Sequence, residues 1–453
     1  MHREAVIEVS KFARLTFVWV GIIFGAVWAA CWLVGIALPT WIDQTFQPRE
    51  VALAWSNTLR VIVPLVAVMV FIPINAMFMV LAERRALALF TVRKGPNRVG
   101  PDGLLQTAAD AVKLLFKEDI TPRGADPVMF TLAPIIFFAP SIIGVIPLLA
   151  AATNNHGLFA VANLPTGIFY VLAISSIPVV GIVMGGWASN NKYSLVGGLR
   201  SAAQAISYEI PLVLAVITVC MLAGTLDVVR IANQQAAVLV GEQTVPAGLL
   251  GWNILGGGVL IQAMAALKSG APDAAIGLVA AVLLALCTVL LFLIYITGAC
   301  AEVNRIPFDL PEAESELVSG YNTEYSGIKF AIFFLAEFTN LFVVSTIAVV
   351  LFLGGGHGPF PGFDESVAAQ IESVLHQLSG PIGWLLNSLI DGPTLVAALW
   401  VIVKTYTLVI FAILVRATLP RFRIDQLMDF GWKRLIPLSM ILLIAVTFLR
   451  ELV

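Results

Sequence analysis

The sequence has 453 residues, of which 59% are hydrophobic and 12% are charged, and its net charge is −2. This composition, with a mean hydropathy of +0.94 and repeated apolar stretches of about 20 residues, excludes an ordinary soluble protein and predicts an all-α polytopic membrane protein. The near-neutral charge gives no support for nucleic-acid binding. The four scattered cysteines form no C-x-x-C pair and no glycine-rich nucleotide motif occurs, so we expect no cofactor or metal site on this chain alone.

Nine transmembrane helices are predicted from the apolar stretches. They lie at residues 15–38, 59–81, 128–151, 161–187, 202–224, 274–300, 327–353, 394–415 and 435–448. The first follows three basic residues and so imitates a signal peptide, but its apolar run is longer than a signal peptide needs, and we interpret it as retained. The glycine-rich stretch 249–267 is interpreted as a surface or re-entrant segment rather than a tenth helix.

The distribution of Lys and Arg predicts which side each connection faces. With nine helices, the N-terminus and four connections share one side, and together with nearby Lys329 they hold 20 of the 26 basic residues. Cytoplasmic loops collect Lys and Arg, so this side, including the N-terminus, is predicted to be cytoplasmic. The opposite side carries two long connections, 225–273 and 354–393.

The first cytoplasmic connection predicts an amphipathic helix at residues 104–117. One face of this helix is apolar, and the opposite face is polar and includes Asp110. The pattern is typical of a helix that lies in the membrane interface. Two interpretations remain open: a surface anchor, or one wall of a cavity that is entered from the lipid. Glu83 and Arg84 end the preceding transmembrane helix, where charges commonly mark the interface.

Three charged residues fall deep inside predicted transmembrane helices: Glu209, Glu337 and Lys404. A charge near the bilayer centre costs roughly 2.5 to 3.5 kcal/mol on insertion scales, which favours a functional role in a proton path. The alternative is a structural charge that a partner neutralises.

The segment 302–325 concentrates acidic residues between two apolar helices. It holds six of the 28 acidic residues of the chain: Glu302, Asp309, Glu312, Glu314, Glu316 and Glu324. Carboxylates this close together cannot all ionise independently, so some pKa values are expected to rise toward neutrality, as a proton relay requires. A solvated loop is the alternative, but the interleaved Ile306, Phe308 and Leu310 favour a partly buried loop.

Four long motifs follow one another along the chain: ERRALALFTVRKGPNRVGPDGLLQTAADAVKLLFKED, GWASNNKYSLVGGLRSAAQAISYEIPL, NRIPFDLPEAESELVSGYNTEYSG and RATLPRFRIDQLMDFGWK. They closely resemble the H-subunit family of bacterial respiratory complex I, the proton-pumping NADH:quinone oxidoreductase, whose mitochondrial counterpart is subunit 1. The likeness begins near residue 59. We therefore expect an extra N-terminal helix and outer linker at 1–58 and the shared membrane domain at 59–453, with outer insertions at about 225–273 and 354–393.

The resemblance implies a subunit of the bacterial cytoplasmic membrane that forms much of a quinone-reducing chamber and couples its reaction to proton translocation. Carried over by motif, the residues expected at the chamber or its entrance are Glu83, Arg84, Asp110 and Arg305. Those expected in proton coupling are Glu209, Glu302, Asp309, Glu312, Glu314, Glu316 and Glu337. Val303 departs from the family, which usually has Thr at this position.

The resemblance also implies a set of partners. Quinone would be the substrate, and NADH, FMN and the iron–sulfur clusters would lie on partner subunits, so this chain alone would hold no complete active site. The expected neighbours are iron–sulfur and quinone-site subunits of the peripheral arm, small membrane subunits, antiporter-like subunits and lipid. Two alternatives remain: the equivalent subunit of a related membrane-bound hydrogenase, and a proton-coupled solute transporter. A transporter would be expected to show two repeated halves, and the sequence has no such symmetry.

Overall fold

The computed structural model describes residues 49–153, 164–240, 243–269, 274–310, 318–377 and 392–452. The predicted first helix at 15–38 lies outside the described residues. So do Glu312, Glu314 and Glu316 of the acidic segment.

Among the described residues, seven helices are long and apolar enough to cross a membrane, which confirms the predicted all-α polytopic class. They are α5 (Pro127–Thr153), α6 with α7 (Gly167–Ser176 and Pro178–Ala188), α8 (Lys192–Ala223), α11 (Ala274–Glu302), α13 (Gly327–Phe352), α16 (Gly392–Thr418), and α17, the π-helical turn η7 and α18 in succession (Ile424–Phe430, Gly431–Leu435 and Ile436–Glu451). The predicted helix at 59–81 lies within α3 (Arg49–Phe90), whose 42 residues form one continuous helix.

Local sequence explains where two of these helices differ from the prediction. The stretch predicted as one helix at 161–187 is divided into α6 and α7 at Pro178, because proline lacks an amide N–H and disfavours helical backbone in the residue before it. Helix α8 begins about ten residues earlier than predicted, since the side chain of Asn191 accepts a hydrogen bond from the amide of Tyr193 and caps its first turn.

The predicted amphipathic helix is present as α4 (Gln106–Phe116), which follows a short 3-10 turn, η2 (Pro101–Gly103). The stretch 249–267 forms the turns η4 (Gly248–Gly251) and η5 (Asn253–Leu255) and most of α10 (Val259–Ser269). Eleven residues of helix extend only about 16 Å, which is too short to cross a bilayer core of about 30 Å. The prediction that this stretch is not a further transmembrane helix is confirmed.

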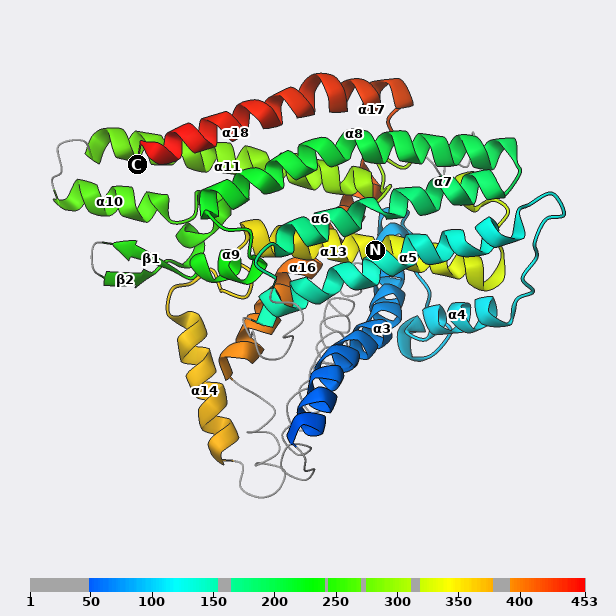
Figure 1. Cartoon of the computed structure of the whole chain (residues 1–453), viewed down its shortest axis with the longest axis horizontal. Coiled ribbons are helices and arrows are strands. Elements are labelled where there is room, and N and C mark those ends of the chain that lie inside the picture. The colour runs from blue at the N-terminus through cyan, green and yellow to red at the C-terminus, as the bar shows by residue number, and fades with distance from the viewer. Residues whose placement is uncertain are drawn as a thin grey trace.

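Apart from η6 (Gly320–Asn322), which lies in the acidic segment, the remaining elements belong to the two long connections that were predicted to be outer. The first contains α9 (Val228–Gln234) and a hairpin of β1 (Ala237–Val240) and β2 (Gln243–Pro246), which pair antiparallel. The second contains α14 (Phe363–Gln377). Figure 1 shows β1, β2 and α10 near one end of the molecule and α4 and α17 near the other, which agrees with the predicted separation of the two sets of connections.

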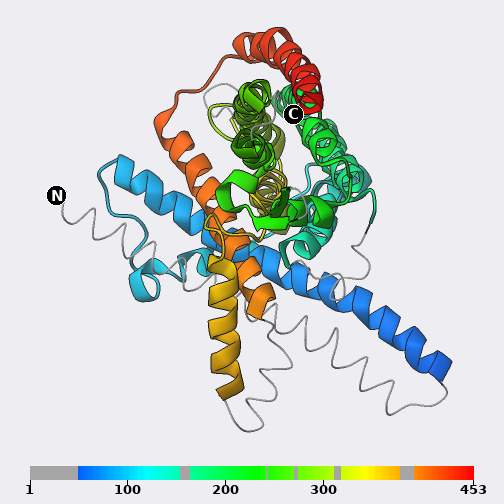
Figure 2. The same cartoon turned by 90° about the vertical axis from the view of Figure 1, so that its left-hand side faces the viewer.

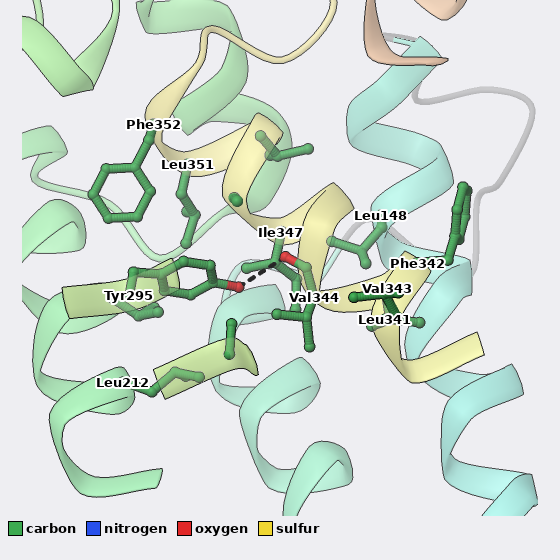
Figure 3. Packing of buried hydrophobic residues seen from close by; sticks show 14 of the residues in the cluster. Leu148, Leu212, Tyr295, Leu341, Phe342, Val343, Val344, Ile347, Leu351 and Phe352 are labelled. Carbon is green, nitrogen blue, oxygen red and sulfur yellow. Dashed lines mark hydrogen bonds between the residues drawn. The ribbon is translucent and has the colours of Figure 1, made fainter. Parts of the chain in front are cut away.

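Most of the helices run along the long axis of the molecule, and α3 and α16 are inclined to them (Figures 1 and 2). Helix α13 lies at the centre, since 78% of its apolar stretch is buried, against 22% for the stretch that ends with α18. Its neighbours interlock through aromatic and aliphatic side chains, and the Tyr295 hydroxyl on α11 donates a 2.9 Å hydrogen bond to the carbonyl of Val344 on α13 (Figure 3). The helix that carries Glu337 is therefore held inside the bundle.

Three buried polar side chains cap the C-terminal end of α13. The Gln235 amide donates to the carbonyl of Val350, the Asn253 amide donates to that of Leu351, and the ammonium of Lys404 donates to that of Leu353. The Lys404 ammonium also donates to the carbonyls of residues 355 and 357 at 3.0 and 2.5 Å. A cation at a helix C-terminus is favourable, so these contacts support the structural interpretation of Lys404.

Candidate functional site

A buried ion cluster centred on Glu83 joins three parts of the chain. Glu83, near the end of α3, is 5% exposed, and its carboxylate accepts from Arg305 at 2.7 Å and from Arg416 of α16. The Arg305 guanidinium also lies 4.2 Å from the centre of the Phe338 ring on α13. Charge-assisted hydrogen bonds of this kind fix geometry, so the cluster holds α3, α16 and the loop after α11 in one arrangement.

The loop that carries Arg305 is held by Gln204 of α8. The side-chain amide of Gln204 donates to the carbonyls of Ala301 and Phe308, at 2.8 and 2.7 Å, and to the side-chain oxygen of Asn304 at 3.1 Å. Asn304 has a φ of 51°, a backbone region that asparagine tolerates better than most residues, and this lets the chain turn sharply after α11. The turn directs Arg305 back toward Glu83.

Asp309 adds a second buried carboxyl to the same loop. It is 8% exposed and accepts from Arg421 at 3.1 Å, whereas its other oxygen has no hydrogen-bond partner among the residues that the structure describes. Burial raises the pKa of the Asp309 carboxyl, and the guanidinium groups of Arg421, Arg416 and Arg305 oppose that rise without cancelling it. Asp309 is therefore a group that can bind and release a proton beside a set of fixed positive charges.

Two of the residues predicted at the chamber or its entrance, Arg84 and Asp110, form a separate and more exposed group. Arg84 pairs with Asp110 of α4 at 2.5 Å, and both side chains are more than one third exposed. Arg85 donates to the carbonyl of Asp102 in η2, so the end of α3 is fixed to α4. The apolar face of α4 is not covered by the rest of the described chain: its exposed side chains are Leu105, Val112, Leu115 and Phe116.

A narrow cavity begins at Glu302, the last residue of α11. Its volume is about 50 Å³, and Glu302, Val303, Ser141 and Asn340 line part of it. The Ser141 hydroxyl donates to the Asn340 side-chain oxygen at 2.5 Å. A cavity of this size has room for a few water molecules but is far below the volume of about 300 Å³ at which small-molecule pockets begin. The Glu302 carboxyl also lies within Coulombic range of Glu209 on α8.

Two further carboxylates have partners on neighbouring elements. The hydroxyl of the fully buried Tyr321 donates to Glu337 at 2.8 Å, which connects the end of the acidic segment to α13. The Asn191 amide donates to Glu324 at 2.6 Å, which connects the same segment to the start of α8. The described ends of the acidic segment are thus tied into the protein, as a partly buried loop requires.

The structure brings together Glu83, Arg305 and Asp309, whereas Arg84 and Asp110 form the separate group near α4. Glu302 and Glu209 are near enough for their charges to interact. Sequence reasoning did not single out the other participants, which are Gln204, Tyr321, Arg416 and Arg421. The two arginines lie in a recognised motif but were interpreted only as charges that mark the cytoplasmic side. No periodicity identifies their partners, since Arg416 is 333 residues from Glu83.

Comparisons with known proteins agree on one family. A family model described as NADH dehydrogenase matches residues 63–447. The H subunit of the NADH-quinone oxidoreductase of Dehalococcoides mccartyi (strain CBDB1) is 40% identical over 390 residues, which cover 86% of this chain and 87% of that protein. The protein of the same name from Dehalococcoides mccartyi (strain ATCC BAA-2266 / KCTC 15142 / 195) is 39% identical over 389 residues, which cover 86% of each chain.

Proposed function

The chain belongs to the NADH dehydrogenase family, and we propose that it forms much of the quinone chamber of an NADH-quinone oxidoreductase and couples quinone reduction to proton translocation. Electrons would come from an iron–sulfur cluster of a partner subunit, with NADH and FMN farther away in the peripheral arm. The chain would lie in the bacterial cytoplasmic membrane with its N-terminus in the cytoplasm. The observation that carries the proposal is the buried Glu83–Arg305–Arg416 cluster beside Asp309.

The charges of this cluster suit a site where a quinone gains electrons. Arg305, Arg416 and Arg421 supply three positive charges, and Glu83 and Asp309 supply at most two negative ones. The cluster is therefore positive, and more so when Asp309 is protonated. Fixed positive charge in a buried site stabilises negative charge that develops on a substrate. The α4 helix and the Arg84–Asp110 pair would border the lipid entrance, because the uncovered apolar face of α4 continues the lipid-facing surface.

Coupling would begin in the loop between Arg305 and Asp309 and continue through Glu302. Reduction of a quinone consumes protons and changes charge in the chamber, and Asp309, on the chamber loop, is able to change its protonation state in response. Glu302 leads into the water-sized cavity, where Ser141 and Asn340 supply polar walls. Glu209 and Glu337 would pass the electrostatic change on toward antiporter-like partners, and Glu312, Glu314 and Glu316 would act within the same acidic segment.

The coupling role is tested by replacing carboxyls in the assembled complex. Glu209→Gln and Glu302→Gln are each expected to lower both quinone reductase activity and the number of protons pumped per NADH. Glu451→Gln, which changes an exposed carboxyl at the far end of α18, is the control and should leave both unchanged. Normal pumping in both test variants would remove these residues from the mechanism.

Co-purification separates this proposal from the alternatives of a related hydrogenase subunit and a solute transporter. Affinity purification of the chain is expected to recover iron–sulfur and antiporter-like subunits that together oxidise NADH. Hydrogen oxidation by the recovered complex, or solute uptake by the chain alone, would overturn the assignment.

A further inference from the structure

We propose that a pocket lined by α8, the loop after α11, α17 with the residue Phe422 before it, and η7 binds the headgroup of an anionic phospholipid. This pocket has a volume of about 310 Å³ and is separate from the Glu302 cavity. Its volume falls in the range of small-molecule sites. No step of the proposed quinone chemistry uses it, so the lipid site stands or falls independently of the quinone chamber.

The walls of the pocket are aromatic and preformed. The rings of Tyr208 and Phe308 lie 5.4 Å apart, and those of Phe308 and Phe422 lie 5.8 Å apart. Tyr208 is fixed because its hydroxyl donates to the carbonyl of Leu427 at 2.9 Å. Phe422 is fixed at the backbone by a hydrogen bond from its amide to the carbonyl of Pro307. An occupant therefore meets a stable apolar surface.

The rim of the pocket provides one uncompensated positive charge. Arg434 lines the pocket and makes no ion pair within the described part of the chain. The other charged rim residue, Asp429, is paired with Lys433 at 2.8 Å, so its negative charge is offset. A guanidinium of this kind is well suited to the phosphate of a lipid headgroup.

The position of the pocket at the head of α18 favours a membrane lipid over a soluble anion. Trp432 is 51% exposed, and its indole donates to Ser207 at 3.1 Å, an arrangement typical of aromatic residues at headgroup level. Leu438 and Ile441 lie three residues apart in α18, which places them on one face of that helix, and Arg434 lies in the π-helical turn directly before it. Leu438 and Ile441 are 40% and 63% exposed, so acyl chains can lie along α18 below a headgroup held by Arg434.

Site-specific photo-cross-linking in the assembled complex tests the proposal. Phe422 is replaced by p-benzoylphenylalanine, and the complex is reconstituted in vesicles of equimolar phosphatidylglycerol and phosphatidylcholine. After illumination, mass spectrometry of the cross-linked peptides is expected to show mainly phosphatidylglycerol adducts. Adding Arg434→Gln should lower the phosphatidylglycerol adduct about fivefold, the effect of losing one basic contact at a membrane surface. Arg423→Gln removes an equal charge at the N-cap of α17, outside the pocket, and should leave the ratio of the two adducts unchanged.

Three outcomes would overturn the lipid site. Adducts to another subunit would show that a protein segment fills the pocket. Equal adducts of the two lipids, or a ratio that Arg434→Gln does not change, would remove the headgroup contact. If the Phe422 variant does not assemble, the same probe is placed at Phe430, which also lines the pocket, and absence of any lipid adduct there rejects the proposal.

Discussion

Replacing Glu83 by Gln gives the most direct test of the buried ion cluster. The variant keeps the size of the side chain but leaves the Arg305 guanidinium facing a neutral amide, with side-chain exposures of only 8% for Arg305 and 7% for Glu83. Breaking a buried ion pair by removing one partner costs about 3 to 5 kcal/mol, because the remaining charge stays in a poorly solvated place. The Arg416 contact adds little to that cost, since its side chain is 30% exposed and water screens it.

The expected consequence is a complex that assembles less efficiently and inactivates at lower temperature. The assays are the yield of intact complex and the temperature at which half of the quinone reductase activity is lost. Arg84→Gln is the matched control, because the Arg84–Asp110 pair is more than one third exposed and such pairs contribute about 0 to 1 kcal/mol.

A double variant separates the loss of the ion pair from the cost of leaving one buried charge unpaired. Glu83→Gln combined with Arg305→Met removes both buried charges, and it should inactivate at a higher temperature than Glu83→Gln alone. Two results would contradict this account: Glu83→Gln as stable as the Arg84→Gln control, or a double variant whose destabilisation relative to wild type equals the sum of those of Glu83→Gln and Arg305→Met. In either case the cluster does not hold α3, α16 and the loop together as described.

Two further predictions concern α13. Lys404→Met leaves three carbonyls at the C-terminal end of the helix without their ammonium donor. It should destabilise the complex by about 2 kcal/mol or more, measured by thermal inactivation. The control is Lys268→Met, at an exposed position, which should change the stability by less than about 0.5 kcal/mol. Tyr321→Phe removes the 2.8 Å hydrogen bond to Glu337. If Glu337 takes part in coupling, this variant should pump fewer protons per NADH while its thermal stability changes little. Unchanged pumping would leave Tyr321 with a packing role only.

The transmembrane architecture could be predicted because apolar length and charge bias are local properties of the sequence. The helix at 104–117 and the rejection of 249–267 as a transmembrane helix followed from periodicity and length, and both agree with the structure. The predicted ends of helices were less accurate where a single residue determines the end. Asn191 extends α8 by capping its first turn, and Pro178 divides a continuous apolar stretch. Such effects depend on single side chains and not on the average of a window.

The candidate site could be predicted only in part, because ion pairs join residues that are far apart in the chain. Glu83 and Arg305 came from motifs, but their direct contact spans 222 residues, and the third member, Arg416, was counted only as a topological charge. Lys404 shows the reverse case. A buried lysine in a transmembrane helix suggested function, yet its ammonium lies against three main-chain carbonyls that no sequence pattern identifies. A charged residue within a transmembrane helix thus indicates that some group neutralises or solvates it, but not whether that group is a side chain, the main chain or a substrate.

Asp309 allows a test of whether the loop after α11 can carry a proton. Its pKa is raised above the ordinary value of 3.8, chiefly by burial, with Arg421, Arg416 and Arg305 acting in the opposite direction. A carboxyl with a raised pKa in the folded protein binds its proton more tightly than in the unfolded chain. Its contribution to stability is therefore fully present below pH 3.8 and is lost as the pH rises through the folded-state pKa.

Infrared difference spectroscopy of the complex can follow this proton directly. On titration upward from pH 3.8, the wild-type complex should retain an absorption band of a protonated carboxyl, and Asp309→Asn should lack this band. The control is Asp429→Asn, which removes an exposed carboxyl and should retain the band. Arg421→Gln should shift the loss of the band to higher pH, because Arg421 is the strongest of the groups that favour the ionised form. Identical spectra for wild type and Asp309→Asn would mean that Asp309 is already ionised, and that the loop transmits the charge of the quinone reaction without binding a proton at this position.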